Sequence, residues 1–357
     1  MAFHSLWDNP WRASHLYRRP DRCRPAGRCW KAGNAVGDDF PRFTVAAVQA
    51  APVFLDREAT IDKACHLVQE AARNGARIIV FPETWVPTYP FWDTQRGGAW
   101  LDLFRNSVEV PSPSTDRLAQ AARKAEAYVA IGVNERDSRT RGSLYNSLLY
   151  FGPDGTLLGV HRKLMPSAGE RLIWGMGDGA GLHVLETPLG RLGGLICWEH
   201  EMTLVKYAMY ARGEQIHASV WPAWTFQRDH IQFGTRQYAY EGKCFVIVSA
   251  GLLDADIVPE SWRTNRGSVG RQVADGGSAI IGPDGDYLAG PVYEQETVVY
   301  ADIDLARVAL AKRLMDTAGH YSRPDVVRLL FDGSAKEPLI NRALPELLVD
   351  SSDSSES

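Results

Sequence analysis

The tetrapeptide Gly-Pro-Asp-Gly occurs twice in this chain, at 152–155 and at 282–285, and each copy lies between two strand-like runs. Asp, Pro and Gly in this arrangement favour a tight turn, so each copy predicts a β-hairpin. Strand-like runs alternate with helical segments upstream of each hairpin. Because no linker-like segment separates the two parts, we expect two similar halves that pack as one domain.

The predicted elements make this an α/β chain with mixed sheets. Val, Ile and Leu dominate the strands, and helices join them, so each sheet is expected to be covered by helices on at least one face. The hairpins argue against a doubly wound fold or a regular eight-stranded barrel. We predict strands at 43–50, 77–81, 128–135, 143–151, 156–161, 183–186, 191–197, 215–221, 244–250, 277–281 and 287–290, and helices at 61–74, 116–127, 203–211 and 231–241.

Composition narrows the class of partner and the compartment. The chain has 357 residues, 45% of them hydrophobic, which is enough for a large core without disulfides or metals. A net charge of −4 does not favour nucleic acid or a membrane surface, so a small molecule is the expected partner. The five cysteines are few and odd in number, which predicts a reducing, cytoplasmic location. No apolar run reaches about 18 residues, so no membrane-spanning helix is expected.

Three short segments carry side chains suited to covalent catalysis. Cys197 follows the apolar run Leu195-Ile196, Glu83 follows Phe-Pro, and Lys163 lies just beyond the first hairpin. A thiol, a carboxylate and an ammonium can act as nucleophile, proton carrier and partner for a developing negative charge. Each also has an ordinary structural interpretation: a buried core thiol, a capping or salt-bridged glutamate, and a solvated lysine.

Two further residues bear on the chemistry of these segments. Glu170 lies close enough in sequence to fix the ammonium of Lys163. His200 is the rival base for Cys197, as in cysteine proteases, but side chains three residues apart in a turn usually diverge, and no orienting Asn or Asp is evident. A zinc site at Cys23 and Cys29 is not expected, because no second pair of Cys or His at ligand spacing accompanies them.

Together these segments resemble the nitrilase superfamily of carbon-nitrogen hydrolases. The resemblance rests on Phe-Pro-Glu-Thr at 81–84, His-Arg-Lys-Leu-Met-Pro at 161–166, Glu-Arg-Leu-Ile-Trp-Gly-Met-Gly-Asp at 170–178 and Cys-Trp-Glu-His at 197–200, and the last of these favours the nitrilase branch. It implies a four-layer α-β-β-α sandwich, a homodimer or larger homo-oligomer, and no metal or organic cofactor. It also implies a catalytic triad of Glu83, Lys163 and Cys197, with Glu170 beside the lysine.

The resemblance covers residues 43–330, which we expect to form the carbon-nitrogen hydrolase domain. Residues 1–42 are a basic, arginine-rich extension expected to be disordered or loosely packed, with targeting or nucleic-acid binding as the alternative. Residues 331–357 form a tail whose acidic, serine-rich end is also expected to be disordered.

The resemblance implies hydrolysis of an organic nitrile to the carboxylic acid and ammonia through thioimidate and thioester intermediates on Cys197. The alternatives are an amidase or carbamoylase of the same superfamily, a nitrile or cyanide hydratase that releases the amide, and a non-catalytic binding or scaffold protein. Large aromatic residues near the motifs could line an apolar pocket or fill the core. The pocket candidates are Trp85, Trp92, Trp198, Trp221 and Trp224.

Overall fold

The computed structural model describes residues 40–336, with gaps at 93, 95–97, 258–259 and 261–271. All statements below concern this described part. Most of the predicted basic extension, residues 1–39, and most of the predicted tail, residues 337–357, lie outside it. None of the described helices is long and apolar enough to cross a membrane.

The first sheet has six strands in the order β13-β1-β2-β3-β4-β5. Strands β1, β2 and β3 run parallel to one another, whereas β4, β5 and β13 are antiparallel to their neighbours. The strands are β1 (Arg42–Gln49), β2 (Ala76–Val80), β3 (Tyr128–Arg136), β4 (Leu144–Phe151), β5 (Leu157–Arg162) and β13 (Thr297–Asp304).

The second sheet has seven strands, in the order β10-β11-β9-β8-β7-β6, with β12 also paired to β11. Strands β7, β8 and β9 are parallel, and the other pairs are antiparallel. The strands are β6 (Val184–Thr187), β7 (Gly190–Ile196), β8 (Ile216–Trp221), β9 (Phe245–Ala250), β10 (Leu252–Asp254), β11 (Gln272–Ile281) and β12 (Tyr287–Tyr293).

The two halves share one topology, as predicted. The series β1-β2-β3-β4-β5 of the first sheet corresponds to β7-β8-β9-β11-β12 of the second, with three parallel strands followed by an antiparallel hairpin. The Gly-Pro-Asp-Gly turns at 152–155 and 282–285 join equivalent strands, β4 to β5 and β11 to β12. After each hairpin the chain crosses to the other sheet: β6 pairs with β7, and β13 pairs with β1. The strand that follows each hairpin therefore forms an edge of the sheet that belongs to the other half of the chain.

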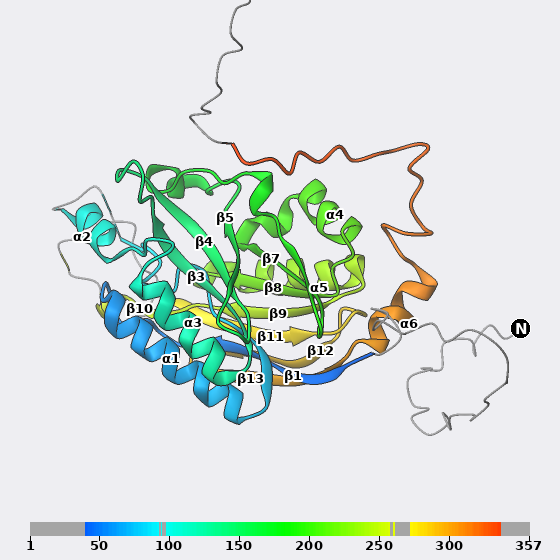
Figure 1. Cartoon of the computed structure of the whole chain (residues 1–357), viewed down its shortest axis with the longest axis horizontal. Coiled ribbons are helices and arrows are strands. Elements are labelled where there is room, and N and C mark those ends of the chain that lie inside the picture. Colours follow the sequence, from blue (N-terminus) through cyan, green and yellow to red (C-terminus); the bar gives the residue numbers. More distant parts are fainter. Residues whose placement is uncertain (1–39, 93, 95–97, 258–259, 261–271, 337–357) are drawn as a thin grey trace, which may run out of the picture. The chain divides into compact units, whose positions relative to one another are not determined.

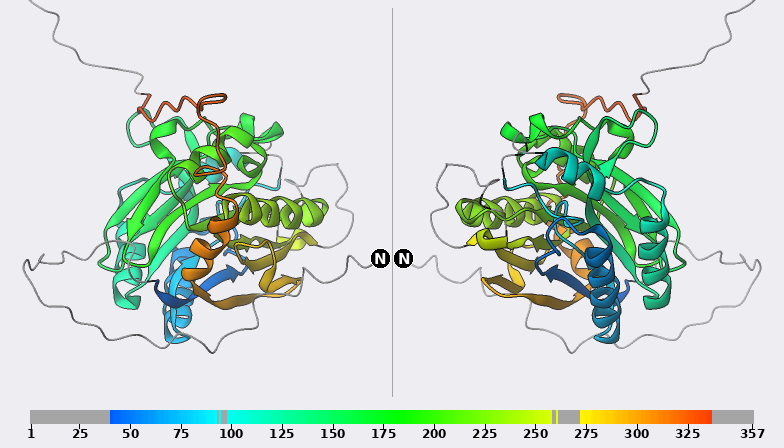
Figure 2. Two further views of the ribbon diagram at one scale, coloured as in Figure 1. Left: turned by 90° about the vertical axis from the view of Figure 1, so that its right-hand side faces the viewer. Right: turned by 90° about the vertical axis from the view of Figure 1, so that its left-hand side faces the viewer.

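Helices cover the outer face of each sheet. Figure 1 shows α1 (Arg57–Arg73) and α3 (Pro113–Ala125) with the first sheet, and α4 (Thr203–Ala211) and α5 (Arg228–Gly242) with the second; Figure 2 shows the same layers turned by 90°. The alternation of side chains along β1 produces these layers, because successive residues point to opposite faces. Val45 and Ala47 pack toward the second sheet, whereas Ala46 and Val48 pack in the cluster beneath the helices. The α-β-β-α sandwich is thus confirmed.

Most predicted elements are present, with some of their ends shifted, and four further elements were not predicted. Helix α1 begins at Arg57 rather than at 61, because the side chain of Asp56 accepts a hydrogen bond from Ala59 N and caps the first turn. Helix α3 begins at Pro113, where Ser112 forms a capping box with Thr115. The sequence prediction missed β13, β10, α6 (Ala306–Leu314) and α2 (Ala99–Asn106).

Candidate active site

The three candidate catalytic residues lie just beyond the ends of strands in the two facing sheets. Glu83 follows β2, Lys163 immediately follows β5, and Cys197 immediately follows β7. The first two strands belong to the first sheet, and β7 belongs to the second. The side chains are almost entirely buried, with 1 to 2% of each residue exposed.

The segment that carries Glu83 runs alongside β3. Phe81 N donates to Ala130 O at 2.8 Å, and Val86 N donates to Gly132 O at 3.2 Å. The close approach requires glycine in β3, because a Cβ on Gly132 would lie 2.2 Å from Pro82 O and 2.8 Å from the carbonyl carbon of Glu83. The absence of a side chain at this one position therefore sets where Glu83 lies.

The ammonium of Lys163 lies between two carboxylates. Its Nζ is 2.9 Å from Glu83 Oε1 and 2.8 Å from Glu170 Oε2. Glu170 is held in turn by the hydroxyl of Tyr89, which donates to its Oε1 at 2.5 Å, and by Ser167 N at 2.6 Å from Oε2. Lys163 and Glu170 thus form a direct buried ion pair.

Burial and these charges set the protonation states of the pair. Burial raises the pKa of Glu83, the Lys163 ammonium and an amide hydrogen bond from Asn146 lower it, and the result is about 7. Burial alone would lower the pKa of Lys163, but the negative charges around it, Glu83 foremost, raise that pKa instead. Lys163 therefore remains an ammonium near neutral pH, while Glu83 is able to take up and release a proton.

Cys197 directly follows β7 and is the first residue of the short 3₁₀ helix Cys197–Glu201. Its φ of 53° lies in the left-handed region, which is uncommon for a residue with a side chain. Burial and the negative charge of Glu83 raise the pKa of the thiol well above its usual value, although Lys163 opposes this. The resting group is therefore a thiol, which needs a base before it can act as a nucleophile.

His200 does not act on the thiol in this geometry. Its Nδ1 donates to the main-chain oxygen of Cys197 at 2.6 Å, and its Nε2 lies 2.8 Å from Ser219 Oγ and 3.0 Å from His217 Nε2. Burial and the neighbouring His217 hold the pKa of His200 well below its usual value. The expected divergence of the two side chains is therefore observed.

The five tryptophans named from the sequence lie in different surroundings. Trp85 and Trp221 are 2% and 1% exposed; Trp85 Nε1 donates to Ala50 O, and Trp221 stacks on the ring of His200. Trp198 is 44% exposed. Trp92 belongs to the same buried cluster as Tyr89, and Trp224 packs against it at the edge.

A small cavity lies next to Glu83. It has a volume of about 20 Å³, enough for one water molecule, and Pro82, Tyr89, Phe91 and Leu253 are among its lining residues. Glu83 Oε2 is buried and has no hydrogen-bond partner among the described residues. Glu83 therefore has a free acceptor oxygen and lines a cavity of suitable size for a water molecule.

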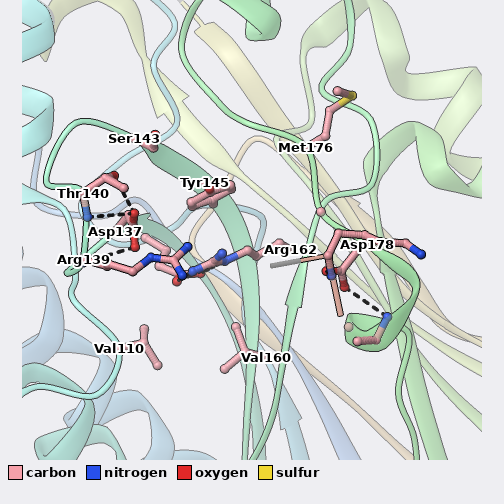
Figure 3. Close-up of a pocket in the computed structure, with 15 residues that line it drawn as sticks. Val110, Asp137, Arg139, Thr140, Ser143, Tyr145, Val160, Arg162, Met176 and Asp178 are labelled. Atoms are coloured by element: carbon pink, nitrogen blue, oxygen red, sulfur yellow. Dashed lines mark hydrogen bonds and ion pairs between the residues drawn. The ribbon is translucent and has the colours of Figure 1, made fainter. Parts of the chain in front are cut away.

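Figure 3 shows a larger open pocket, of about 640 Å³. Its lining includes Tyr145 and Arg162 but neither Glu83, Lys163 nor Cys197. Arg162 forms an ion pair with Glu135 and lies over the ring of Tyr145 at 3.9 Å, and Asp137 accepts hydrogen bonds within its own loop. Because these charges satisfy one another, we assign no function to this pocket.

Sequence reasoning did not single out Asn146 or Glu199. Asn146 lies in β4, and its Nδ2 donates to Glu83 Oε1 at 2.6 Å. A polar residue in an apolar strand was the available signal for Asn146. Glu199 lies within Cys-Trp-Glu-His and hydrogen-bonds to two of the candidate segments. Within the described ranges, no group of three or more His, Cys, Asp or Glu side chains could hold a metal ion.

Two mixed sheets face to face, helices on both outer faces, and a buried cluster of cysteine, lysine and two glutamates define the nitrilase-superfamily class of hydrolases. Comparison with known proteins gives the same result. The carbon-nitrogen hydrolase family model matches residues 44–313. The chain therefore belongs to the carbon-nitrogen hydrolase family, and its relatives place it in the nitrilase branch.

Two relatives illustrate the branch, and one solved structure illustrates the fold. A nitrilase of Bacillus sp. (strain OxB-1) is 40% identical over 84% of this chain and 91% of its own length. A bifunctional nitrilase/nitrile hydratase of Lupinus angustifolius is 41% identical over 85% of this chain and 90% of its own length. The structure of Nit3 of Saccharomyces cerevisiae, a member of branch 10 of the nitrilase superfamily, matches with a TM-score of 0.64 at 20% identity, covering 78% of this chain and 96% of Nit3.

Proposed function

We propose that this protein hydrolyses an organic nitrile to the carboxylic acid and ammonia through a covalent intermediate on Cys197. The observation that carries the proposal is the buried ammonium of Lys163, held between Glu83 and Glu170, together with the buried Cys197 thiol at the end of β7 in the facing sheet. The similarity to nitrilases over most of the chain supports the choice of a nitrile as substrate.

In the first step, Glu83 takes the proton of the Cys197 thiol and the sulfur attacks the nitrile carbon. One π bond of the nitrile breaks, and its electron pair moves to nitrogen, where the Lys163 ammonium stabilises the negative charge. Glu83 then gives the same proton to that nitrogen, which leaves a thioimidate on Cys197. A pKa of about 7 suits Glu83 to both transfers, because neither protonation state is strongly favoured near neutral pH.

In the second step, water adds to the thioimidate carbon. Glu83 accepts a proton from this water, for which it is suited because its Oε2 has no other partner among the described residues and the residue lines the water-sized cavity. Glu83 returns its proton to the nitrogen of the tetrahedral adduct, the hydroxyl proton of the adduct also moves to that nitrogen, and ammonia leaves as the thioester carbonyl forms. A second water cleaves the thioester to the acid and restores the Cys197 thiol. The net reaction consumes one nitrile and two waters and yields one acid and one ammonia.

The same adduct can expel the thiol in place of ammonia and so release the amide. The bifunctional nitrilase/nitrile hydratase of Lupinus angustifolius supports release of the amide as a second product. Which group leaves depends on where the proton goes, to the amine nitrogen or to the sulfur. We therefore expect acid as the main product, with amide alongside it.

Apolar and aromatic residues around Glu83 favour a nitrile with an apolar substituent. Phe91 and Trp224 have ring centroids 4.6 Å apart, and Tyr89 and Trp224 have centroids 6.0 Å apart. Tyr89 and Phe91 also line the cavity beside Glu83. Of the five tryptophans, Trp85 lines that cavity, and Trp224 and Trp92 lie in or against the aromatic cluster, so we propose these three as pocket residues ahead of Trp198 and Trp221.

The deciding experiment measures ammonia, acid and amide released from a panel of aliphatic, arylaliphatic and aromatic nitriles, with the matching amides in parallel. Cys197→Ala is the blank, because alanine tolerates the same backbone conformation about as well as cysteine does. We expect turnover of nitriles by the unmodified protein and none by the variant. Turnover of amides alone would make the protein an amidase or carbamoylase, and turnover of neither would contradict the proposal.

We also propose a homodimer or larger homo-oligomer. Phe226, Phe233 and Tyr240 recur at intervals of seven residues, along α5 and just before it, and are 67, 68 and 53% exposed, which is typical of an apolar face that a partner covers. Leu204 on the neighbouring α4 is 68% exposed. Light scattering should give at least twice the mass of the chain, and Phe233→Lys should lower it if this face is the interface.

The proposal also includes the extent of the catalytic domain and the cellular compartment of the protein. We propose residues 43–330 as the catalytic domain, supported by the family match over 44–313. The described cysteines, Cys65, Cys197 and Cys244, are free, which supports a reducing, cytoplasmic compartment.

A further inference from the structure

We infer that Glu199 is a positioning residue that holds the Cys197 and Lys163 segments at a set separation. The inference rests on the proposed function, because its main measurement is the product ratio of that reaction. Glu199 has no part in the mechanism above, and 1% of the residue is exposed.

Both oxygens of Glu199 bind main-chain groups next to the candidate catalytic residues. Oε1 accepts a hydrogen bond from Leu164 N at 2.7 Å, and Leu164 directly follows Lys163. Oε2 accepts one from Ile196 N at 2.7 Å, and Ile196 directly precedes Cys197. Since β5 leads into Lys163 and β7 leads into Cys197, a single carboxylate ties the two sheets together at this point.

A third donor makes a charged carboxylate necessary. His161 Nε2 lies 2.8 Å from Glu199 Oε2, so the two oxygens together accept three N–H groups. Burial raises the pKa of Glu199, but the interaction with His161 and the two main-chain N–H groups outweigh it and lower the pKa. Glutamine has the same size, but its amide nitrogen would face at least one of these N–H donors and could not accept from it.

The separation that Glu199 sets affects both rate and product. The sulfur of Cys197 and the ammonium of Lys163 must both be correctly placed around the nitrile for attack and for charge stabilisation. A displacement of about 1 Å can lower the rate by about 10²-fold. The choice between expelling ammonia and expelling the thiol depends on the same geometry. The acid-to-amide ratio is an intensive quantity, so it does not change when a variant merely lowers the amount of folded protein.

The test compares Glu199→Gln with a matched control, Glu214→Gln. Glu214 is equally buried and binds His217 Nδ1 at 2.8 Å and the Tyr238 hydroxyl at 2.6 Å. It contacts no main-chain group next to Lys163 or Cys197 and reaches the latter only through two histidine rings. We expect Glu199→Gln to lower kcat by about 10- to 100-fold and to raise the amide fraction. We expect Glu214→Gln to lower the melting temperature and leave the acid-to-amide ratio unchanged.

A second measurement does not depend on the reaction. The rate at which iodoacetamide alkylates Cys197, followed by mass spectrometry of its peptide, should fall in Glu199→Gln and not in Glu214→Gln, since thiol reactivity depends on the nearby ammonium. If the unmodified protein turns over no nitrile or amide, the proposed function fails, and the alkylation rates still test this inference.

Two results would overturn the inference. One is that folded Glu199→Gln has the product ratio and the alkylation rate of the unmodified protein. The other is that Glu214→Gln changes the product ratio and the alkylation rate as much as Glu199→Gln does, which would indicate a general effect of losing a buried acid. If Glu199→Gln does not fold, Glu199→Asp replaces it, because it keeps the charge but loses one methylene of reach. An unchanged ratio in that variant overturns the inference as well.

Discussion

The ammonium of Lys163 lies 2.9 Å from Oε1 of Glu83, although 80 residues separate them in the chain. Both side chains are fully buried, and Glu170 supplies a second carboxylate to the same ammonium. A proton that moves from the Cys197 thiol to Glu83 leaves the total charge of this buried cluster unchanged. Moving a proton within the cluster therefore avoids the cost of creating a new net charge in a low-dielectric interior.

Replacement of Lys163 by methionine should abolish most turnover. The substitution removes the charge that stabilises the developing anion, and loss of one such donor typically lowers kcat by about 10²- to 10³-fold. Circular dichroism should show that the variant is folded. Lys206→Met is the matched control, because Lys206 is also buried and paired, with Glu241 at 2.9 Å, but lies on α4. Near-normal turnover by folded Lys163→Met would remove the lysine from the mechanism.

The pH dependence of kcat/KM should show an acid limb near pH 7. The active form has Glu83 ionised, and its pKa is about 7, so kcat/KM should fall about tenfold per unit below that pH. The pKa of Lys163 is raised, so deprotonation of Lys163 should not produce a descending limb up to pH 9. Rates measured from pH 5 to 9 at constant ionic strength test this. A limb at pH 4 to 5, the range of an ordinary glutamate, would contradict it.

Asn146→Leu should move that acid limb to higher pH. The amide of Asn146 donates to Glu83 Oε1 at 2.6 Å and lowers the pKa of Glu83, so its loss makes the carboxylate harder to ionise. A hydrogen bond to a charged group contributes about 1.5 to 3 kcal/mol, which corresponds to a shift of about one pH unit or more.

The control for this shift is Asn134→Leu. Asn134 is also buried, but it binds Thr88 O and Trp174 Nε1, not Glu83. This variant should be less stable and keep the acid limb of the unmodified protein. If both variants shift the limb equally, the effect does not come from the bond to Glu83.

Gly132→Ala should lower both activity and stability. The added Cβ would lie 2.2 Å from Pro82 O, so the segment that carries Glu83 has to move. Overpacking of this kind costs about 1 to 3 kcal/mol, and displacement of Glu83 by about 1 Å would cost up to about 10²-fold in kcat. Gly142→Ala is the control, because its nearest neighbour, Thr140 O, would be 4.0 Å from the new Cβ. Unchanged kcat in Gly132→Ala would show that the site tolerates the shift.

Much of the fold could be predicted because its signals are local. The alternation of Val45, Ala46, Ala47 and Val48 and the repeated Gly-Pro-Asp-Gly turns depend only on neighbours in the chain. Strand β13 was missed because its place depends on pairing with β1, more than 200 residues away, and only a hydrogen-bonded register shows that pairing. The ends of α1 and α3 were misplaced because their caps, Asp56 and Ser112, precede the apolar pattern.

The sequence by itself determined which chemical groups are available: a thiol, an ammonium and two carboxylates at the ends of predicted strands, with the motifs of one superfamily. Only the tertiary structure decided which groups meet: Asn146 on Glu83, Glu199 between Leu164 and Ile196, and Trp221 against His200. The physical reason is that residue type and short-range pattern depend on local bonding. Distances of 2.6 to 2.9 Å between remote segments depend on how two sheets pack and on where a single glycine, Gly132, lets the backbones approach.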